Sequence, residues 1–328
     1  MGTCLFRSPL AFRLQCFLEA RKKAGRRGKS SQKILIYIDR FLTGELQPGQ
    51  TITREIAERW IKSLESLSVG TRINRISILR QFCLYLAHFD PRTCVVHRSF
   101  LPRRTRPAPY IYSRKEVRQI MAATRRIGPH GSLRPVVVAT LVGLLYTTGL
   151  RIGEALRLTL ADVDLKRRVL LVQETKFKKS RYVPLSSSTV AQLHAYLRRR
   201  HQTRVSMSAD APFFVNRRGE RFGQTAFTNA FLEIIRRLGI RGPKGQPGPR
   251  VHDFRHSFAV NRLLAWYRQR VNLSAKLPLL STYLGHTTVS CTEVYLHATA
   301  QLLESAGRRF HTHFAVPPLS RKRSYAHN

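Results

Sequence analysis

Acidic residues are scarce in this chain of 328 residues: 18 Asp and Glu stand against 58 Lys and Arg, a formal net charge of +40. A solvated basic face explains a modest positive excess but not one this large. Such a chain repels itself unless a polyanion neutralises it, and nucleic acid is the usual one. Residues 1–106 carry 21 basic and 7 acidic residues, and residues 107–328 carry 37 and 11. Both parts are therefore expected to contact nucleic acid.

Cysteine and long apolar runs are also rare. The five cysteines are scattered without a CxxC pair, which argues against a zinc site or a disulfide framework and favours a reducing cytoplasm. The longest apolar stretch, residues 135–149, is too short to cross a bilayer and is typical of a buried helix. Arg7 and Arg13 interrupt the apolar residues of the amino terminus, so a secretory signal is not expected; an Arg-rich targeting peptide is the minor alternative. We expect no association with membranes.

The remaining pattern predicts two mainly helical domains and a small β-sheet. Residues 32–89 contain about four amphipathic helices, with basic residues on their polar faces that contact phosphates or are simply solvated. Residues 102–110 (PRRTRPAPY) form the best boundary, because three prolines prevent a regular helix and the arginines keep the segment solvated. Beyond the boundary, 168–173 and 181–185 predict the strands of a β-hairpin around the polar loop 174–180.

Chemistry-bearing residues lie in short motifs of the second domain. They are Arg151 in TTGLRIGEAL, His252 and Arg255 in HDFRH, His286 in LGH, and Tyr295 nine residues further on. His252 and Arg255 are three apart at a predicted helix start and so share one helix face. Each has a structural alternative: Arg151 can pair with Glu154, and His252 can cap its helix. As a set, a phenol among permanent cations suits attack on a phosphodiester, because a phenol with a pKa of ~10 needs its developing charge stabilised.

In this order the motifs resemble those of the tyrosine recombinases, the family of phage integrases and chromosome-dimer resolvases. The match runs through TGLRIGEAL, the loop lysine of TKFKKSRYVPL, HDFRH, LGH and the terminal tyrosine. It extends to the helical amino-terminal domain and the basic linker, so it covers most of the chain. Each motif alone is weak, whereas six residues in order make a specific signal. The resemblance implies an N-terminal helical core-binding (SAM-like) bundle and a mixed α/β catalytic domain.

The resemblance also implies the domain limits. We expect a basic N-terminal segment at 1–30, a helical DNA core-binding domain at 31–101, a basic Pro-rich linker at 102–110, a catalytic domain at 111–312 and a basic C-terminal tail at 313–328.

The family's chemistry assigns Tyr295 as the nucleophile that attacks the scissile phosphate, leaving a 3′-phosphotyrosine and a free 5′-hydroxyl. Arg151 and Arg255 would clamp the non-bridging oxygens. Lys176 would protonate the departing 5′-oxygen, with Lys178 and Lys179 as competing candidates.

The two imidazoles complete the implied site. His252 would act as general base or acid near the nucleophile, and His286 would hydrogen-bond a phosphate oxygen. Glu154 would have a supporting role, and His256 would pack locally. Because the covalent ester conserves the energy of the broken bond, neither ATP, a metal nor another cofactor is expected.

We therefore predict a site-specific DNA recombinase that integrates, excises or transposes a mobile element. Its expected partners are double-stranded DNA, further copies of itself up to a tetrameric synapse, and accessory recombination proteins; its expected location is the cytoplasm, on the nucleoid. A type IB topoisomerase shares the cleavage chemistry, but the separate helical domain argues against it. A non-catalytic architectural DNA-binding protein is disfavoured by the complete motif set, and an RNA-binding protein by its order.

Two departures from the family pattern bear on the setting. The 31 residues from Arg255 to His286 exceed the spacing of a compact resolvase by about two helical turns, and the insert resembles recombinases carried by transposons. The second departure is the region after Tyr295, which ends in the basic RKRSYAHN; its apolar residues Leu302, Leu303 and Phe310 would dock on a neighbouring protomer or pack within their own chain.

Overall fold

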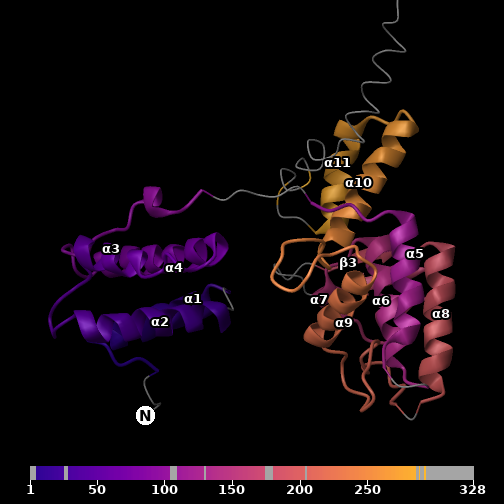
Figure 1. The fold of residues 1–328 in the computed structure, drawn as a ribbon, viewed down its shortest axis with the longest axis horizontal. Coiled ribbons are helices and arrows are strands. Elements are labelled where there is room, and N and C mark those ends of the chain that lie inside the picture. The colour runs from indigo at the N-terminus through magenta and orange to yellow at the C-terminus, as the bar shows by residue number, and fades with distance from the viewer. Residues whose placement is uncertain are drawn as a thin grey trace, which may run out of the picture. The chain divides into compact units, whose positions relative to one another are not determined.

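The computed structural model describes residues 5–25, 29–103, 109–128, 131–173, 180–203 and 205–285, with residues 288 and 292. The chain divides into two compact units, Met1–Pro107 and Ala108–Asn328. The division falls inside the proline-rich segment 102–110. In the described residues the predicted fold class is confirmed, because helices dominate both units and a small sheet lies in the second (Figure 1).

The first unit is a bundle of helices α1 (Ala11–Lys23), α2 (Lys29–Glu45), α3 (Arg54–Lys62) and α4 (Val69–Ala87), followed by the 3-10 turn η1 (Arg98–Phe100). Its core joins Leu35 and Ile38 of α2, Trp60 of α3 and Phe82 of α4, all buried. The apolar spacing in 32–89 thus faces a shared interior, as amphipathic helices require.

Helix α1 corrects the expected start of this domain. Residues 1–30 were expected to be a basic segment outside the bundle, but α1 contacts both α2 and α4. It buries Leu14, Phe17 and Leu18 in the same core, and the Phe17 ring lies 5.4 Å from that of Phe82. The i, i+3, i+4 spacing of these residues directs one face inward although the helix ends in three basic residues.

The second unit is built around helix α6 (Arg134–Thr148), which is the apolar stretch predicted to be a buried helix. It contacts α5 (Arg114–Ala123), η2 (Thr124–Arg126), α7 (Ile152–Arg157), α8 (Ser187–His201), α9 (Gln224–Arg237) and α10 (Asp253–Arg268). Because it has neighbours on all sides, its apolar residues need no polar face. Helix α11 (Leu273–Leu284) pairs with α10, and the two form a hairpin that projects from the rest of the unit (Figure 1).

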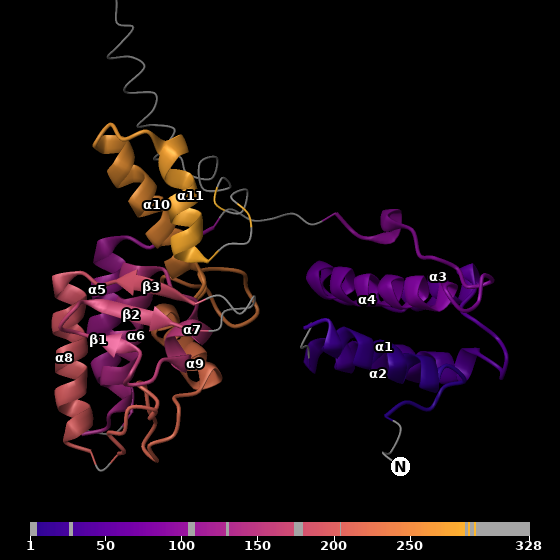
Figure 2. The ribbon, with the colours of Figure 1, turned by 180° about the vertical axis from the view of Figure 1, so that it is seen from behind.

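The sheet has the order β1-β2-β3, with β1 at Val163–Asp164, β2 at Val169–Val172 and β3 at Arg181–Pro184. All pairs are antiparallel, and Leu170 faces Val183 across the hairpin. The predicted hairpin is therefore present, and β1 adds a short third strand (Figure 2). Within the part of the chain that the structure describes, no helix is both long and apolar enough to span a membrane.

Candidate active site

Two glycine turns form the framework of the candidate site. Helix α6 ends at Gly149 with φ +64°, and helix α11 ends at Gly285 with φ +66°. Both residues are left-handed helix caps, a conformation that glycine adopts without steric cost. Space also restricts Gly149, because a Cβ there would lie 2.7 Å from Cδ1 of Phe258. The chain therefore reverses tightly at two places that precede two motif residues, Arg151 and His286.

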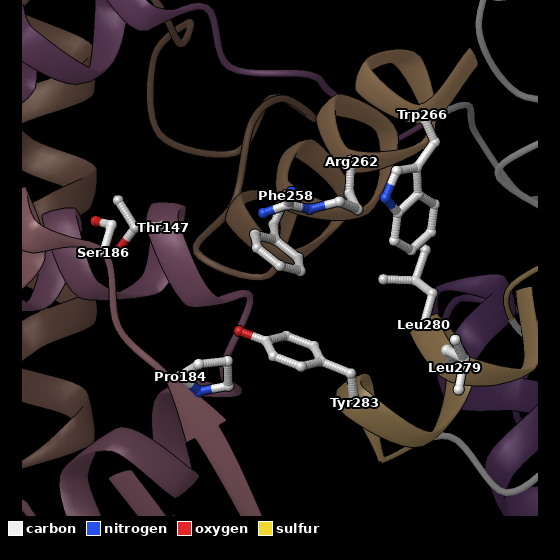
Figure 3. Close-up of a pocket in the computed structure, with 9 residues that line it drawn as sticks. All are labelled: Thr147, Pro184, Ser186, Phe258, Arg262, Trp266, Leu279, Leu280 and Tyr283. Atoms are coloured by element: carbon white, nitrogen blue, oxygen red, sulfur yellow. The ribbon is translucent and has the colours of Figure 1, made fainter. Parts of the chain in front are cut away.

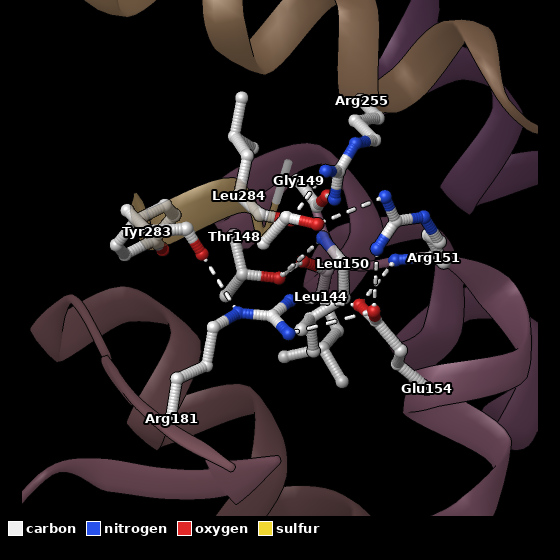
Figure 4. Close-up of polar contacts among 11 residues, drawn as sticks. Leu144, Thr148, Gly149, Leu150, Arg151, Glu154, Arg181, Arg255, Tyr283 and Leu284 are labelled. Carbon is white, nitrogen blue, oxygen red and sulfur yellow. Dashed lines mark hydrogen bonds and ion pairs between the residues drawn. The ribbon is translucent and has the colours of Figure 1, made fainter. Parts of the chain in front are cut away.

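Two arginines connect these turns. Arg255, on α10, donates from Nη1 to the carbonyl of Gly149 at 2.9 Å and from Nη2 to the carbonyl of Leu284. Arg151, at the start of α7, donates from Nη2 to the carbonyl of Gly285 at 3.2 Å. These are carbonyls at helix ends, which lack partners inside their helices. Each guanidinium thus donates hydrogen bonds to carbonyl groups at the end of a helix other than its own. The two cations lie beside each other where the ends of α6 and α11 meet (Figure 4).

The two guanidinium groups differ in access. Arg255 is 1% exposed, whereas 39% of the Arg151 side chain is accessible. Two backbone carbonyls therefore hold the Arg255 guanidinium inside the unit, and the Arg151 guanidinium is the more accessible of the two.

Glu154 is the buried anion of the cluster. Its Oε1 accepts from Nη1 of Arg151 at 2.8 Å, and its Oε2 accepts from the backbone N–H of Arg151 at 3.0 Å. The pairing foreseen as the structural alternative for Arg151 is thus real. Oε2 also accepts from Nη2 of Arg181 at 2.8 Å.

Burial opposes the ionised form of Glu154, but the hydrogen bond and charge of Arg181, followed by those of Arg151, leave its pKa lowered. Glu154 is therefore held as a carboxylate between two arginines.

Arg181 is a member of the site that the sequence patterns did not reveal. It begins β3 on the same strand face as buried Val183, and 12% of its side chain is exposed. Besides Glu154, it holds the carbonyl of Tyr283 through Nε at 2.7 Å. An arginine on the inward face of a strand is the signal that was available, because such a charge requires a buried partner.

His252 lies just before α10, and its side chain makes no capping hydrogen bond. The structural alternative of a capping histidine is therefore not what the geometry shows. Its environment lowers the pKa: partial burial contributes most and the charge of Arg255 next, with Arg151 adding to them and Asp253 opposing. The charges of both arginines thus act on the imidazole of His252 and favour its neutral form.

His256, one turn along α10, packs locally as expected. Its ring lies 4.9 Å from that of His252 in an edge-to-face arrangement. Burial, then His252, lowers its pKa to about 4.

Tyr283 is a tyrosine close to this cluster, yet its ring is turned away from it. The ring stacks on Phe258 at 5.3 Å. It lines a cavity of about 290 Å³ that α10 and α11 form with the ends of α6 and β3, and its hydroxyl is directed toward Pro184 (Figure 3). Burial raises its pKa to about 12. Only the backbone carbonyl of Tyr283 faces the arginines, so its phenol is not placed to attack a phosphate held by them.

Of the six predicted catalytic residues, Arg151, His252 and Arg255 are brought together by α7, α10 and the two glycine turns. Lys176, His286 and Tyr295 lie outside the described residues, as do the competing Lys178 and Lys179 and the tail residues Leu302, Leu303 and Phe310.

The comparison with known families matches residues 112–301 to the phage integrase family, a range that contains all six positions. The integrase/recombinase y4rB of Sinorhizobium fredii is 36% identical over 300 residues, which cover 90% of this chain and 95% of that protein. This chain belongs to the phage integrase family. It is a tyrosine-type site-specific DNA recombinase, and DNA is its partner.

Other similarities agree with this membership. The tyrosine recombinase XerC of Chlamydia caviae is 26% identical over 306 residues, which cover 92% of this integrase-family chain and 90% of that protein. Among solved structures, the Tn1549 transposon integrase in complex with circular intermediate DNA superposes with a TM-score of 0.65 at 18% identity, covering 91% of this chain and 99% of that chain. At that identity the likeness concerns the fold.

Proposed function

We propose that this recombinase cleaves DNA with Tyr295 as the nucleophile, at a phosphate bound by Arg151 and Arg255 beside His252. The observation that carries the proposal is the convergence of these three described residues: the arginines bridge the two glycine turns, and both charges lower the pKa of His252. Two fixed cations beside a neutral imidazole are what a phosphodiester attack by a phenol requires.

In the proposed step, the phenolic oxygen of Tyr295 attacks the scissile phosphorus as the bond to the 5′-oxygen breaks. His252, kept neutral by its lowered pKa, takes the phenolic proton. The guanidinium groups of Arg151 and Arg255 stabilise the negative charge that grows on the non-bridging oxygens. The products are a 3′-phosphotyrosine and a 5′-hydroxyl, and the reverse attack by a 5′-hydroxyl rejoins a strand.

Two further roles rest on the family motifs alone. Lys176 supplies the proton that the departing 5′-oxygen acquires, and His286 donates a hydrogen bond to a phosphate oxygen. Lys176 lies five residues before Arg181, and His286 directly follows Gly285. Both are therefore joined by short chain segments to residues of the described cluster.

The biological setting we propose is the movement of a mobile element. The long spacer between Arg255 and His286 supports it, and so does the fold shared with an integrase whose solved complex contains transposon circular intermediate DNA. Four copies would act in a synapse of two DNA sites, with accessory proteins as further partners, and the expected cellular location is the cytoplasmic nucleoid.

A nicked suicide substrate that carries the ends of the protein's own element tests the proposal. In it the cleaved fragment diffuses away, so that the covalent protein–DNA adduct accumulates. Wild-type protein is expected to form the adduct, Tyr295→Phe to form none, and Tyr283→Phe to form it at a rate close to wild type. Tight binding of these ends without any adduct from wild-type protein would contradict the proposed cleavage.

The same protein, given intact supercoiled DNA that carries two marked sites, distinguishes recombination from topoisomerase action. Joining of two marked sites is the expected result. Relaxation of supercoiled DNA with no exchange between sites would overturn the proposed mobile-element role.

A further inference from the structure

Arg181 connects three segments of the catalytic unit through a single guanidinium group. It belongs to β3, it holds the carboxylate of Glu154 on α7, and it holds the carbonyl of Tyr283 in the last turn of α11. These contacts span 27 and 102 residues of sequence. Figure 4 shows the guanidinium between the two partners. Such a planar fork fixes the direction of each partner as well as its distance.

The first connection determines the state of Glu154. The hydrogen bond and charge of Arg181 are the largest influences that keep this carboxylate ionised against its burial. The same carboxylate receives both the backbone N–H and Nη1 of Arg151. Loss of Arg181 would leave Glu154 with Arg151 as its cation, and the more accessible guanidinium would be drawn inward to neutralise the buried charge.

The second connection determines the end of α11. The Tyr283 carbonyl belongs to the final turn, where carbonyl groups have no partner within the helix. The following residues, Leu284 and Gly285, supply the carbonyls that bind Arg255 and Arg151. Gly285 and Arg181 are tightly packed, because a Cβ on Gly285 would lie 3.0 Å from Nη1 of Arg181. Arg181 therefore fixes the turn that both phosphate-binding candidates contact.

We propose that Arg181 is a positioning residue for DNA cleavage, which acts by holding Glu154 and the α11 turn so that Arg151 presents its guanidinium to the scissile phosphate. This inference rests on the proposed role of Arg151. Arg181 itself is mostly enclosed and is not required to touch the DNA. Loss of Arg181 should therefore lower the rate of cleavage and leave the affinity for DNA almost unchanged.

The test compares Arg181→Gln with wild type in single-turnover cleavage of the nicked substrate and in equilibrium DNA binding. We expect cleavage to slow by about tenfold or more, equal to ~1.4 kcal/mol of transition-state stabilisation, with affinity changed by less than about threefold. Arg181→Lys keeps the charge but reaches only one of the two partners, and is expected to recover part of the rate.

A neutral substrate distinguishes positioning from a general structural defect. In a methylphosphonate at the scissile position, one charged oxygen is replaced by a methyl group, so less charge needs to be stabilised by Arg151. The deficit of Arg181→Gln should shrink on this substrate. Arg200→Gln is the control, since Arg200 is another enclosed arginine of the same unit and holds the carbonyls of Ser206 and Pro212. Its deficit, if any, should be the same on both substrates.

The outcomes are separable. Cleavage by Arg181→Gln at the wild-type rate, or an equal deficit on charged and neutral phosphates, overturns the positioning role while the proposed function stands. No adduct from wild type overturns the proposed function itself. If Arg181→Gln does not fold, the same comparison is made with Arg181→Lys, whose equal deficit on both substrates counts against the proposal in the same way.

Discussion

Replacing Glu154 with glutamine is the perturbation that probes the arginine cluster most severely. The side chain keeps its volume but loses the charge shared by Arg151 and Arg181, and its NH₂ group faces N–H donors. Removing one partner of a buried pair costs about 3–5 kcal/mol. Because 39% of the Arg151 side chain reaches solvent and can rehydrate, we place the loss nearer ~3 kcal/mol. For a unit of this size that corresponds to a fall in Tm of about 6–12 °C.

Scanning calorimetry measures this loss, with the transition of the first unit as an internal reference. Glu233→Gln is the matched control, because it removes the same charge from an exposed pair with Arg237, whose side chains are 48% and 61% accessible. That pair is expected to contribute under ~1 kcal/mol. If the Tm of Glu154→Gln lies within about 2 °C of the control, the two-arginine carboxylate does not stabilise the site as argued.

Three further outcomes follow from the geometry. Gly149→Ala should lose ~1–2 kcal/mol from its left-handed backbone and more from the 2.7 Å contact with Phe258, whereas Gly239→Ala, with φ +69° and open space, should lose the backbone cost alone; urea unfolding compares them. The pKa of His256 is about 4 in the folded protein against an ordinary 6.5, so the unfolded chain binds the proton first as the pH falls. The free energy of unfolding should therefore fall by up to ~3 kcal/mol between pH 6.5 and pH 4, and His256→Gln should make that decline shallower. The pKa of His252, followed by NMR, should lie below 6.5 in wild type and rise in Arg151→Gln. An unchanged pKa in the variant would show that the charge of Arg151 does not act on His252.

The parts of the fold that local patterns encode were predictable. The apolar run that became α6 has no polar face, and two short apolar runs on either side of a polar loop specified the β2–β3 hairpin. Helix α1 was missed because residues 1–30 were assigned to a basic segment, although Leu14, Phe17 and Leu18 carried the helical spacing.

The order of the motifs predicted which residues form the site, but it could not predict the contacts among those that the structure describes. Arg255 binds carbonyls 106 and 29 residues away in sequence, and Arg181 meets Glu154 across 27 residues. Such pairings arise from how α7, α10, α11 and β3 pack together. No local period encodes them, which is why the positioning role of Arg181 emerges only from the structure.

The attachment site of the DNA tests the central claim most directly. The adduct formed on the nicked substrate in the presence of a chelator is digested to peptides, and the peptide that carries the nucleotide is sequenced by mass spectrometry. A single 3′-phosphodiester on Tyr295, absent from Arg151→Ala and Arg255→Ala, is the predicted result. Attachment to another residue, or an undiminished adduct from the arginine variants, would contradict a tyrosine attack on a phosphate held by these two cations.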